Sequence, residues 1–200
     1  LLAMALIGIF AFNFNVFLPL MATNEFHGGS SVFGLLLSVM GVGALAGALV
    51  AASRQSPTMR LLGIGAAGFG GAMVAAALMP SLPWELVALI PMGALMVTVQ
   101  ATANSLLQLH ADPAFRGRVM ALYVMVFLGT TPFGGPLVGF IAQHFGPREA
   151  FALGGTAAAV AGAYVLWALR RSITAEARVA ALERDREPGP GRASTPSPSA

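Results

Sequence analysis

Cysteine and lysine are absent from the chain, and charged residues of either sign are scarce. The 200 residues include eleven basic residues, all of them arginine, and eight acidic ones, so that 10% are charged whereas 56% are hydrophobic. Soluble domains carry charge on about a quarter of their residues. The missing thiols exclude disulfides and thiolate chemistry. This composition predicts an integral membrane protein, and a net charge of +3 is too small to indicate a nucleic-acid-binding surface.

Catalytic and metal-binding motifs are also missing. No GxSxG or HExxH segment occurs. The histidines lie far apart, each in a predicted loop, at His27, His110 and His144. No charged residue is expected inside a membrane span, so an intramembrane carboxylate or metal mechanism has no residues to use. We therefore expect no enzyme, no metal and no cofactor, and any proton-coupling or ion-coupling carboxylate would have to lie outside this sequence.

Six apolar stretches are long enough to cross a bilayer, which takes about 20 residues. They cover Leu1–Met21, Val32–Ala52, Leu61–Met79, Trp84–Leu107, Val119–Ile141 and Ala150–Leu169. We predict an all-α bundle of six transmembrane helices over residues 1–171. Residues 172–200 are predicted to form a cytoplasmic tail, a short helix followed by a disordered segment rich in proline, glycine and serine. Because Leu1 already lies in an apolar run, we expect the chain to be a fragment of a longer protein.

The placement of arginine predicts how the spans are oriented. Arginines lie between spans two and three, between spans four and five, and directly after span six, at Arg54, Arg60, Arg116, Arg118, Arg170 and Arg171. The opposite side has only Arg148, together with acidic residues expected in outer loops, Glu25, Glu85 and Glu149. By the positive-inside rule the even-numbered spans end in the cytoplasm, so both ends of the chain are expected there, in a cell membrane.

The segment from Phe115 to Gly146 interrupts its own helix. Prolines and glycines gather in its middle, at Gly129, Pro132, Gly134, Gly135, Pro136 and Gly139. Proline costs a helix interior about 3 kcal/mol in water, whereas a membrane bundle tolerates it because neighbouring groups bond the freed carbonyls. We expect a hinge here. A GxxxG pair in the second span, Gly43 and Gly47, predicts a close approach between two helices of the same chain.

Amide side chains mark the first and fourth spans. Gln100, Asn104 and Gln108 are four residues apart and form one stripe on a helix. The first span holds Asn13 and Asn15, which point about 200° apart, so at most one of them is expected to face the same side as the stripe. An amide facing lipid is costly, and we expect these five residues to line a substrate cavity. The alternative is that they only bond helices together, typically with about 0.6 kcal/mol per contact.

The polar content of the spans repeats after three. Spans one and four hold the amides, spans two and five are rich in glycine, and spans three and six are nearly free of amides. Since three is odd, such a repeat must be inverted in the membrane. Inverted repeats of this kind build several secondary transporters.

The segment Phe115–Gly146, with its elements RGRVMALY, GTTPFGGP and GFIAQHFG, resembles the eleventh transmembrane segment of major facilitator superfamily transporters. The likeness is strongest to the bacterial branch of enterobactin exporters and macrolide efflux proteins, and it extends from Leu1 to about Leu169. It implies that the six spans correspond to helices seven to twelve of a twelve-helix protein, with the amide-bearing spans lining the central cavity. The second loop departs from the family pattern because it keeps Arg54 but has no aspartate. We therefore expect Arg54 and Arg60 to hold topology rather than to gate.

The sequence is thus interpreted as half of a secondary active transporter. The resemblance implies efflux of a small amphipathic solute, such as a drug or a siderophore, by alternating access with a missing N-terminal half. The partners expected are this half, the solute and the lipid bilayer, with no nucleic acid. The alternative is a non-transporting structural or accessory subunit with six spans, and a homodimeric transporter of two such chains is a third candidate.

Overall fold

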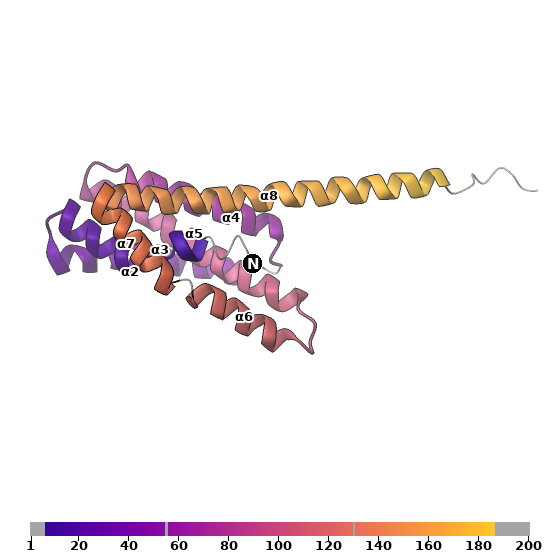
Figure 1. The fold of residues 1–200 in the computed structure, drawn as a ribbon. Coiled ribbons are helices and arrows are strands. Elements are labelled where there is room, and N and C mark those ends of the chain that lie inside the picture. Colours follow the sequence, from indigo (N-terminus) through magenta and orange to yellow (C-terminus); the bar gives the residue numbers. More distant parts are fainter. Residues whose placement is uncertain (1–6, 55, 130, 187–200) are drawn as a thin grey trace, which may run out of the picture. The chain divides into compact units, whose positions relative to one another are not determined.

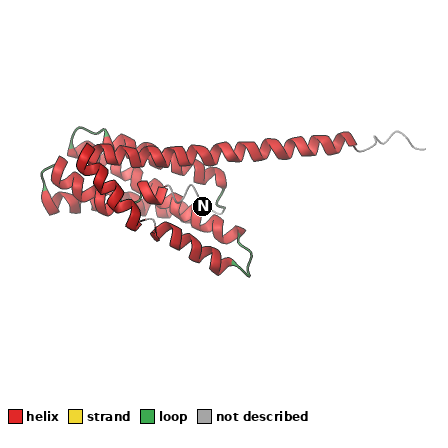
Figure 2. Ribbon diagram, in the orientation of Figure 1, coloured by secondary structure: helices red, strands yellow, loops and turns green. Residues whose placement is uncertain are grey.

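The computed structural model describes residues 7–54, 56–129 and 131–186, and within these ranges every regular element is a helix (Figure 1, Figure 2). After a helical turn at residues 7–10, the elements are α2 (Phe14–Leu20), the π-helix η1 (Met21–Glu25), α3 (Gly29–Ser53), α4 (Met59–Ala77), α5 (Leu82–His110), α6 (Arg116–Gly129), α7 (Thr131–Phe145) and α8 (Pro147–Arg186). The start of the first predicted span and the disordered tail predicted over residues 188–200 lie outside the described residues.

Five helical segments of the described chain are long and apolar enough to cross a membrane. They are Ile7–Glu25, α3, α4, α5 and the part of α8 over Pro147–Arg171. The fifth predicted span is instead divided between α6, with 14 residues, and α7, with 15. The all-helical membrane fold is therefore confirmed, whereas the count of six spans and their arrangement as a repeat stay predictions.

The two prolines of the divided span take different places in α7. Pro132 lies in the first turn of α7, where a helix needs no N–H donor, and its role as a helix breaker stays a prediction. Only Pro136 lies inside α7. α6 ends at Gly129 and α7 begins at Thr131, and residue 130 between them is not among the described residues.

Two histidines predicted in loops lie in helices instead. His110 is in the last turn of α5, with its Nδ1 atom 2.9 Å from the carbonyl oxygen of Leu106. His144 is in the last turn of α7 and makes the same contact with Phe140 at 2.9 Å. In both cases the ring interacts with a carbonyl oxygen one turn earlier on its own helix.

Glycines bring α3 and α5 into backbone contact. A Cβ atom at Gly43 would run into the carbonyl oxygen of Ile90, and one at Gly47 would lie 2.7 Å from the Cα atom of Ala94. Gly93 of α5 meets the carbonyl oxygen of Met40 in the same way. The absence of side chains at these positions lets the two helices approach closely, as in other small-residue helix pairs in membranes.

A second glycine-lined contact joins α4 to α8 within the first of two compact units, residues 1–166 and 167–200. Gly70 of α4 would place a Cβ atom 2.8 Å from the Cα atom of Ala159, and Gly155 would place one 2.8 Å from the backbone nitrogen of Val74. The first span packs on the same pair through aromatic rings. Phe17 meets Phe151 edge-on, with ring centroids 5.1 Å apart.

The second unit begins with the remaining part of α8. Its helix continues to Arg186, so that α8 has 40 residues in all. The division of this region into a span and a tail stays a prediction. The guanidinium group of Arg171 lies 3.9 Å from the centroid of the Trp167 ring. A tryptophan and an arginine paired in this way are typical of the membrane interface.

Candidate functional site

The first span is a discontinuous helix with Asn13 at the interruption. The chain leaves the helical conformation at residues 11–13, and Asn13 itself has φ −92° and ψ 46°. Its side-chain Nδ2 group donates to the carbonyl oxygen of Ile9 at 2.6 Å and lies 3.4 Å from that of Gly8. Asn13 is 2% exposed, so this amide bonds carbonyls that the interruption has freed and that lipid would leave unpaired.

The Asn13 side chain is packed against α7 at the paired glycines of the divided span. A Cβ atom at Gly134 would collide with the carbonyl oxygen of Ile9 and would lie 2.7 Å from Asn13 Nδ2. A Cβ atom at Gly135 would lie 3.9 Å from Asn13 Oδ1. The interruption of the first span therefore lies directly against the N-terminal part of α7.

The remaining predicted cavity residues lie at the surface of the chain. Asn15 and Gln108 are exposed, and Gln100 and Asn104 are half-buried. The Nε2 group of Gln108 donates to Asn104 Oδ1 at 3.0 Å, so these two amides partly satisfy each other along α5. Of the two asparagines in the first span, the structure thus buries Asn13 and exposes Asn15.

Buried hydroxyl groups of α5 were not singled out from the sequence. Thr98 Oγ1 donates to the carbonyl oxygen of Ala94 at 2.8 Å and lies 3.4 Å from that of Gly47 on α3. Thr102 Oγ1 donates to the carbonyl oxygen of Thr98 at 2.6 Å. Threonine hydroxyls on a membrane helix commonly bond in this way, and only the packing of α3 on α5 distinguishes Thr98 from the exposed polar residues.

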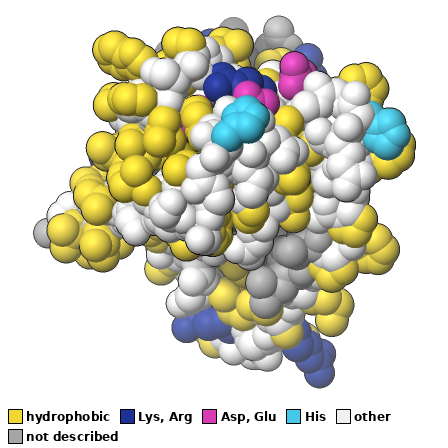
Figure 3. All heavy atoms as spheres, turned by 90° about the vertical axis from the view of Figure 1, so that its left-hand side faces the viewer, with side chains coloured by type: hydrophobic (Ala, Val, Ile, Leu, Met, Phe, Trp, Pro, Cys, Tyr) yellow, Lys and Arg dark blue, Asp and Glu magenta, His cyan; other side chains and the backbone are white. Residues whose placement is uncertain are grey.

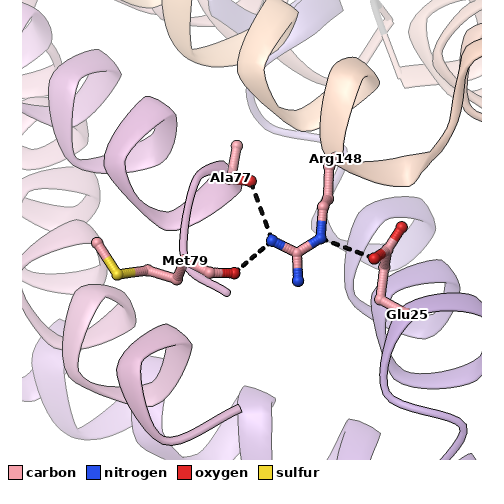
Figure 4. A network of polar contacts seen from close by, with 4 residues as sticks. All are labelled: Glu25, Ala77, Met79 and Arg148. Carbon is pink, nitrogen blue, oxygen red and sulfur yellow. Dashed lines mark hydrogen bonds and ion pairs between the residues drawn. The ribbon is translucent and has the colours of Figure 1, made fainter. Parts of the chain in front are cut away.

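Arg148 binds two other segments at one end of the bundle (Figure 4). Its Nε donates to Glu25 Oε2 at 2.7 Å, and its Nη1 donates to the carbonyl oxygens of Ala77, at 3.3 Å, and Met79. The guanidinium group also lies 5.9 Å from the ring centroid of Phe26. Arg148 at the start of α8 therefore connects the end of η1 with the end of α4. We define these contacts as the Arg148 clasp.

Acidic and basic side chains gather on the face that carries the α4–α5 and α7–α8 connections (Figure 3). A cavity of about 320 Å³ opens beside the Arg148 clasp, and Arg148 and Glu149 line it together with Ala77, Leu78 and Ala152. The sequence identified Arg148 only as the single arginine on its side of the membrane. The sequence did not predict the contact of Arg148 with Glu25, because the two residues are 123 positions apart in the chain.

Glu85 corrects the expectation that it lies in a loop and that no span contains a charged residue. It is in the first turn of α5 and only 1% exposed. Its Oε2 atom is buried without a hydrogen-bond partner. The charged groups that act on it are Arg148 and Glu25. The sequence missed this burial because Glu85 follows Pro83 and Trp84 at the edge of an apolar stretch, where an acidic residue is usually solvated.

The arginines assigned to topology lie at the opposite ends of these helices. Arg54, Arg60, Arg116 and Arg118 are all exposed. Arg54 lines a small cavity of about 50 Å³, together with residues of α4 and α5 that include Leu61, Thr102 and Ser105. Neither this cavity nor the one beside the Arg148 clasp is lined by the amide residues of the predicted substrate cavity.

Within the described residues, no group of three or more histidines and acidic side chains could hold a metal ion.

The comparison with known proteins identifies the family. No curated protein and no solved structure matches the chain. The sequence model of a family described as transmembrane secretion effector, in the major facilitator superfamily, matches residues 1–190. Because this match covers nearly the whole sequence, the chain belongs to the transmembrane secretion effector family of major facilitator superfamily transporters.

Proposed function

We propose that the chain is the C-terminal, six-span half of a secondary active exporter that moves a small amphipathic solute, such as a drug or a siderophore, out of the cell by alternating access. The family match supports a role in membrane transport. Export, the solute class and the partner half go beyond that match. They rest on the likeness of Phe115–Gly146 to the eleventh helix of bacterial exporters and on the distribution of polar side chains.

The amides of α5, which are half-buried or exposed, are the observation that carries this proposal. Gln100, Asn104 and Gln108 lie on one stripe and are not enclosed by the chain's own helices. Lipid would leave most of their donors and acceptors unpaired, because a single bond between Gln108 and Asn104 satisfies only part of them. A water-filled or solute-filled path between this half and a second half removes that cost. We assign Asn15 to the same path and Asn13 to the joint beside it.

The glycine contacts support the proposed inverted repeat. Such a repeat relates spans one, two and three to spans four, five and six, respectively. A contact between spans two and four therefore corresponds to a contact between spans five and one. In the first contact Gly43 of α3 lies against Ile90 of α5, and in the second Gly134 of α7 lies against Ile9. In both, the glycine belongs to the glycine-rich span and the carbonyl to the amide-bearing one.

The test is to replace Gln100 and Asn104 together by alanine in the complete protein and to measure efflux of candidate drugs and siderophores from cells. We expect efflux to fall at unchanged amounts of protein in the membrane. The control is Gln143→Ala, which removes an exposed amide of α7 outside the stripe. Unchanged efflux kinetics in the double variant would return these amides to a role in helix packing.

Water access separates the exporter from a non-transporting accessory subunit. Because these 200 residues contain no cysteine, Asn104→Cys provides a single thiol once any cysteine in the other half is replaced. We expect a membrane-impermeant maleimide to label it, and a transported solute to slow the labelling. Absence of labelling, with no measurable solute flux, would favour the accessory subunit.

A further inference from the structure

Glu85 is a buried carboxyl group for which the proposed export function has no role. It is 1% exposed, and its Oε2 atom has no hydrogen-bond partner. A buried carboxylate without donors is costly, so such groups either acquire a positive partner or bind a proton. The positive charge that acts on Glu85 is that of Arg148. The guanidinium of Arg148, however, is already bound to Glu25 and to the carbonyl oxygens of Ala77 and Met79.

The surroundings of Glu85 contain few other charges. Arg148 comes from α8 and Glu25 from η1, and these are the charged groups that act on it. The helices α3 and α4, which pack on α5, have no titratable or charged residue in their outer turns. Glu149 is exposed, next to Arg148, and His144 is exposed in the last turn of α7. Arg148 is thus paired with Glu25, while its charge also acts on Glu85, which it does not contact by a hydrogen bond or ion pair among the described residues.

We propose that Glu85 is a proton-binding site, and that its proton controls whether the Arg148 clasp is closed. With the proton bound to Glu85, the charges of Arg148 and Glu25 balance and the clasp is stable. When the proton leaves to water, one buried negative charge is uncompensated. Arg148 is then drawn from Glu25 and from the end of α4 towards Glu85, and the clasp loosens.

Loosening of the Arg148 clasp would change the cavity beside it. Arg148 lines the cavity of about 320 Å³ between the end of α4 and the start of α8, so its movement opens this cavity further. In the exporter, this would make opening at this end of the bundle depend on pH. That link rests on the proposed function, whereas the proton site and the clasp do not.

The experiment measures access to the cavity and needs no transport. Ala152 lines the cavity and is half-buried, so Ala152→Cys reports on it in a complete protein in which any cysteine outside these 200 residues is replaced. A second protein carries Ser30→Cys at an exposed position of α3 and corrects for the intrinsic pH dependence of maleimide reactions. Both are labelled in lipid nanodiscs, as the complete protein, between about pH 5.5 and about pH 8.5.

We expect the ratio of the two labelling rates to rise about fivefold or more with pH, the lower end of typical coupling between two sites. Adding Glu85→Gln, which mimics the protonated group, should keep the ratio low at every pH. Glu149→Gln, which removes an exposed carboxylate of the same cavity, should leave the rise unchanged. A ratio that does not change with pH, or a rise that persists in the Glu85→Gln protein, would overturn the proposal.

Glu25→Gln provides a second, independent test of the proposal if the Glu85→Gln protein does not fold. Without the Glu25 carboxylate, Arg148 pairs with ionised Glu85 throughout the pH range, so the ratio should lose its pH dependence. An unchanged rise in this variant would also overturn the proposal. Efflux by the Gln100 and Asn104 double variant tests the export function separately. Failure of the export proposal and failure of the Glu85 proposal can therefore be distinguished.

Discussion

Asn13 and Asn15, two positions apart, are expected to respond differently to the same substitution. Asn13→Ala removes the amide that bonds Ile9 and leaves buried carbonyls unpaired, so we expect a loss of about 1–3 kcal/mol in the free energy of unfolding. Asn15→Ala changes an exposed side chain and should leave stability within about 0.5 kcal/mol. Unfolding in mixed micelles measures both. Equal stabilities would show that the bonds of Asn13 do not hold the interruption.

For single residues, the sequence predicted which polar side chains matter better than it predicted what surrounds them. It singled out Asn13 because an amide in an apolar span must find partners. It did not show that these partners are carbonyls of the same segment, because the interruption at residues 11–13 contains no proline or glycine. Glu85 was misplaced for a similar reason, since burial at the end of a helix is decided by what packs there.

At the scale of helices, the contact between α3 and α5 offers a matched pair of glycines. A Cβ atom at Gly43 would run into the backbone of Ile90, whereas one at Gly41 meets nothing within 4 Å. We expect Gly43→Ala to destabilise the protein by about 1–3 kcal/mol through overpacking. Gly41→Ala should be neutral or stabilise it by about 0.5–1 kcal/mol, because alanine is the better helix former. A similar effect at both positions would argue against the contact.

Proline position makes a second prediction about helices. Pro136 lies inside α7 and removes one helical hydrogen bond there, whereas Pro132 lies in its first turn and removes none. If the divided span is a hinge, Pro136→Ala should stiffen α7 and slow efflux, and Pro132→Ala should have the smaller effect. Transport rates at equal expression decide this. Equal rates in both variants and in the native protein would eliminate the hinge.

For the whole molecule, the arginine distribution predicts which ends of the helices face the cytoplasm. Ser56, beside Arg54, and Ser30, at the start of α3, are both exposed. We expect an impermeant maleimide to label Ser30→Cys in intact cells but Ser56→Cys only after permeabilisation, because the arginine-rich loops stay inside. The reverse pattern would invert the proposed orientation and would place the Arg148 clasp on the cytoplasmic side.

Composition and hydropathy by themselves determined that this protein is an all-helical membrane protein, since the bilayer admits long apolar segments only as helices that bond their own backbone. The sequence also located the glycines of the close α3–α5 contact, because small residues at helical spacing show directly in the chain. Only the tertiary structure decided that Asn13 is enclosed while Asn15 is exposed, that Glu85 is buried, and that Arg148 pairs with Glu25. Those contacts join residues as far as 123 positions apart, and the burial they create depends on how separate helices pack, which local pattern does not contain.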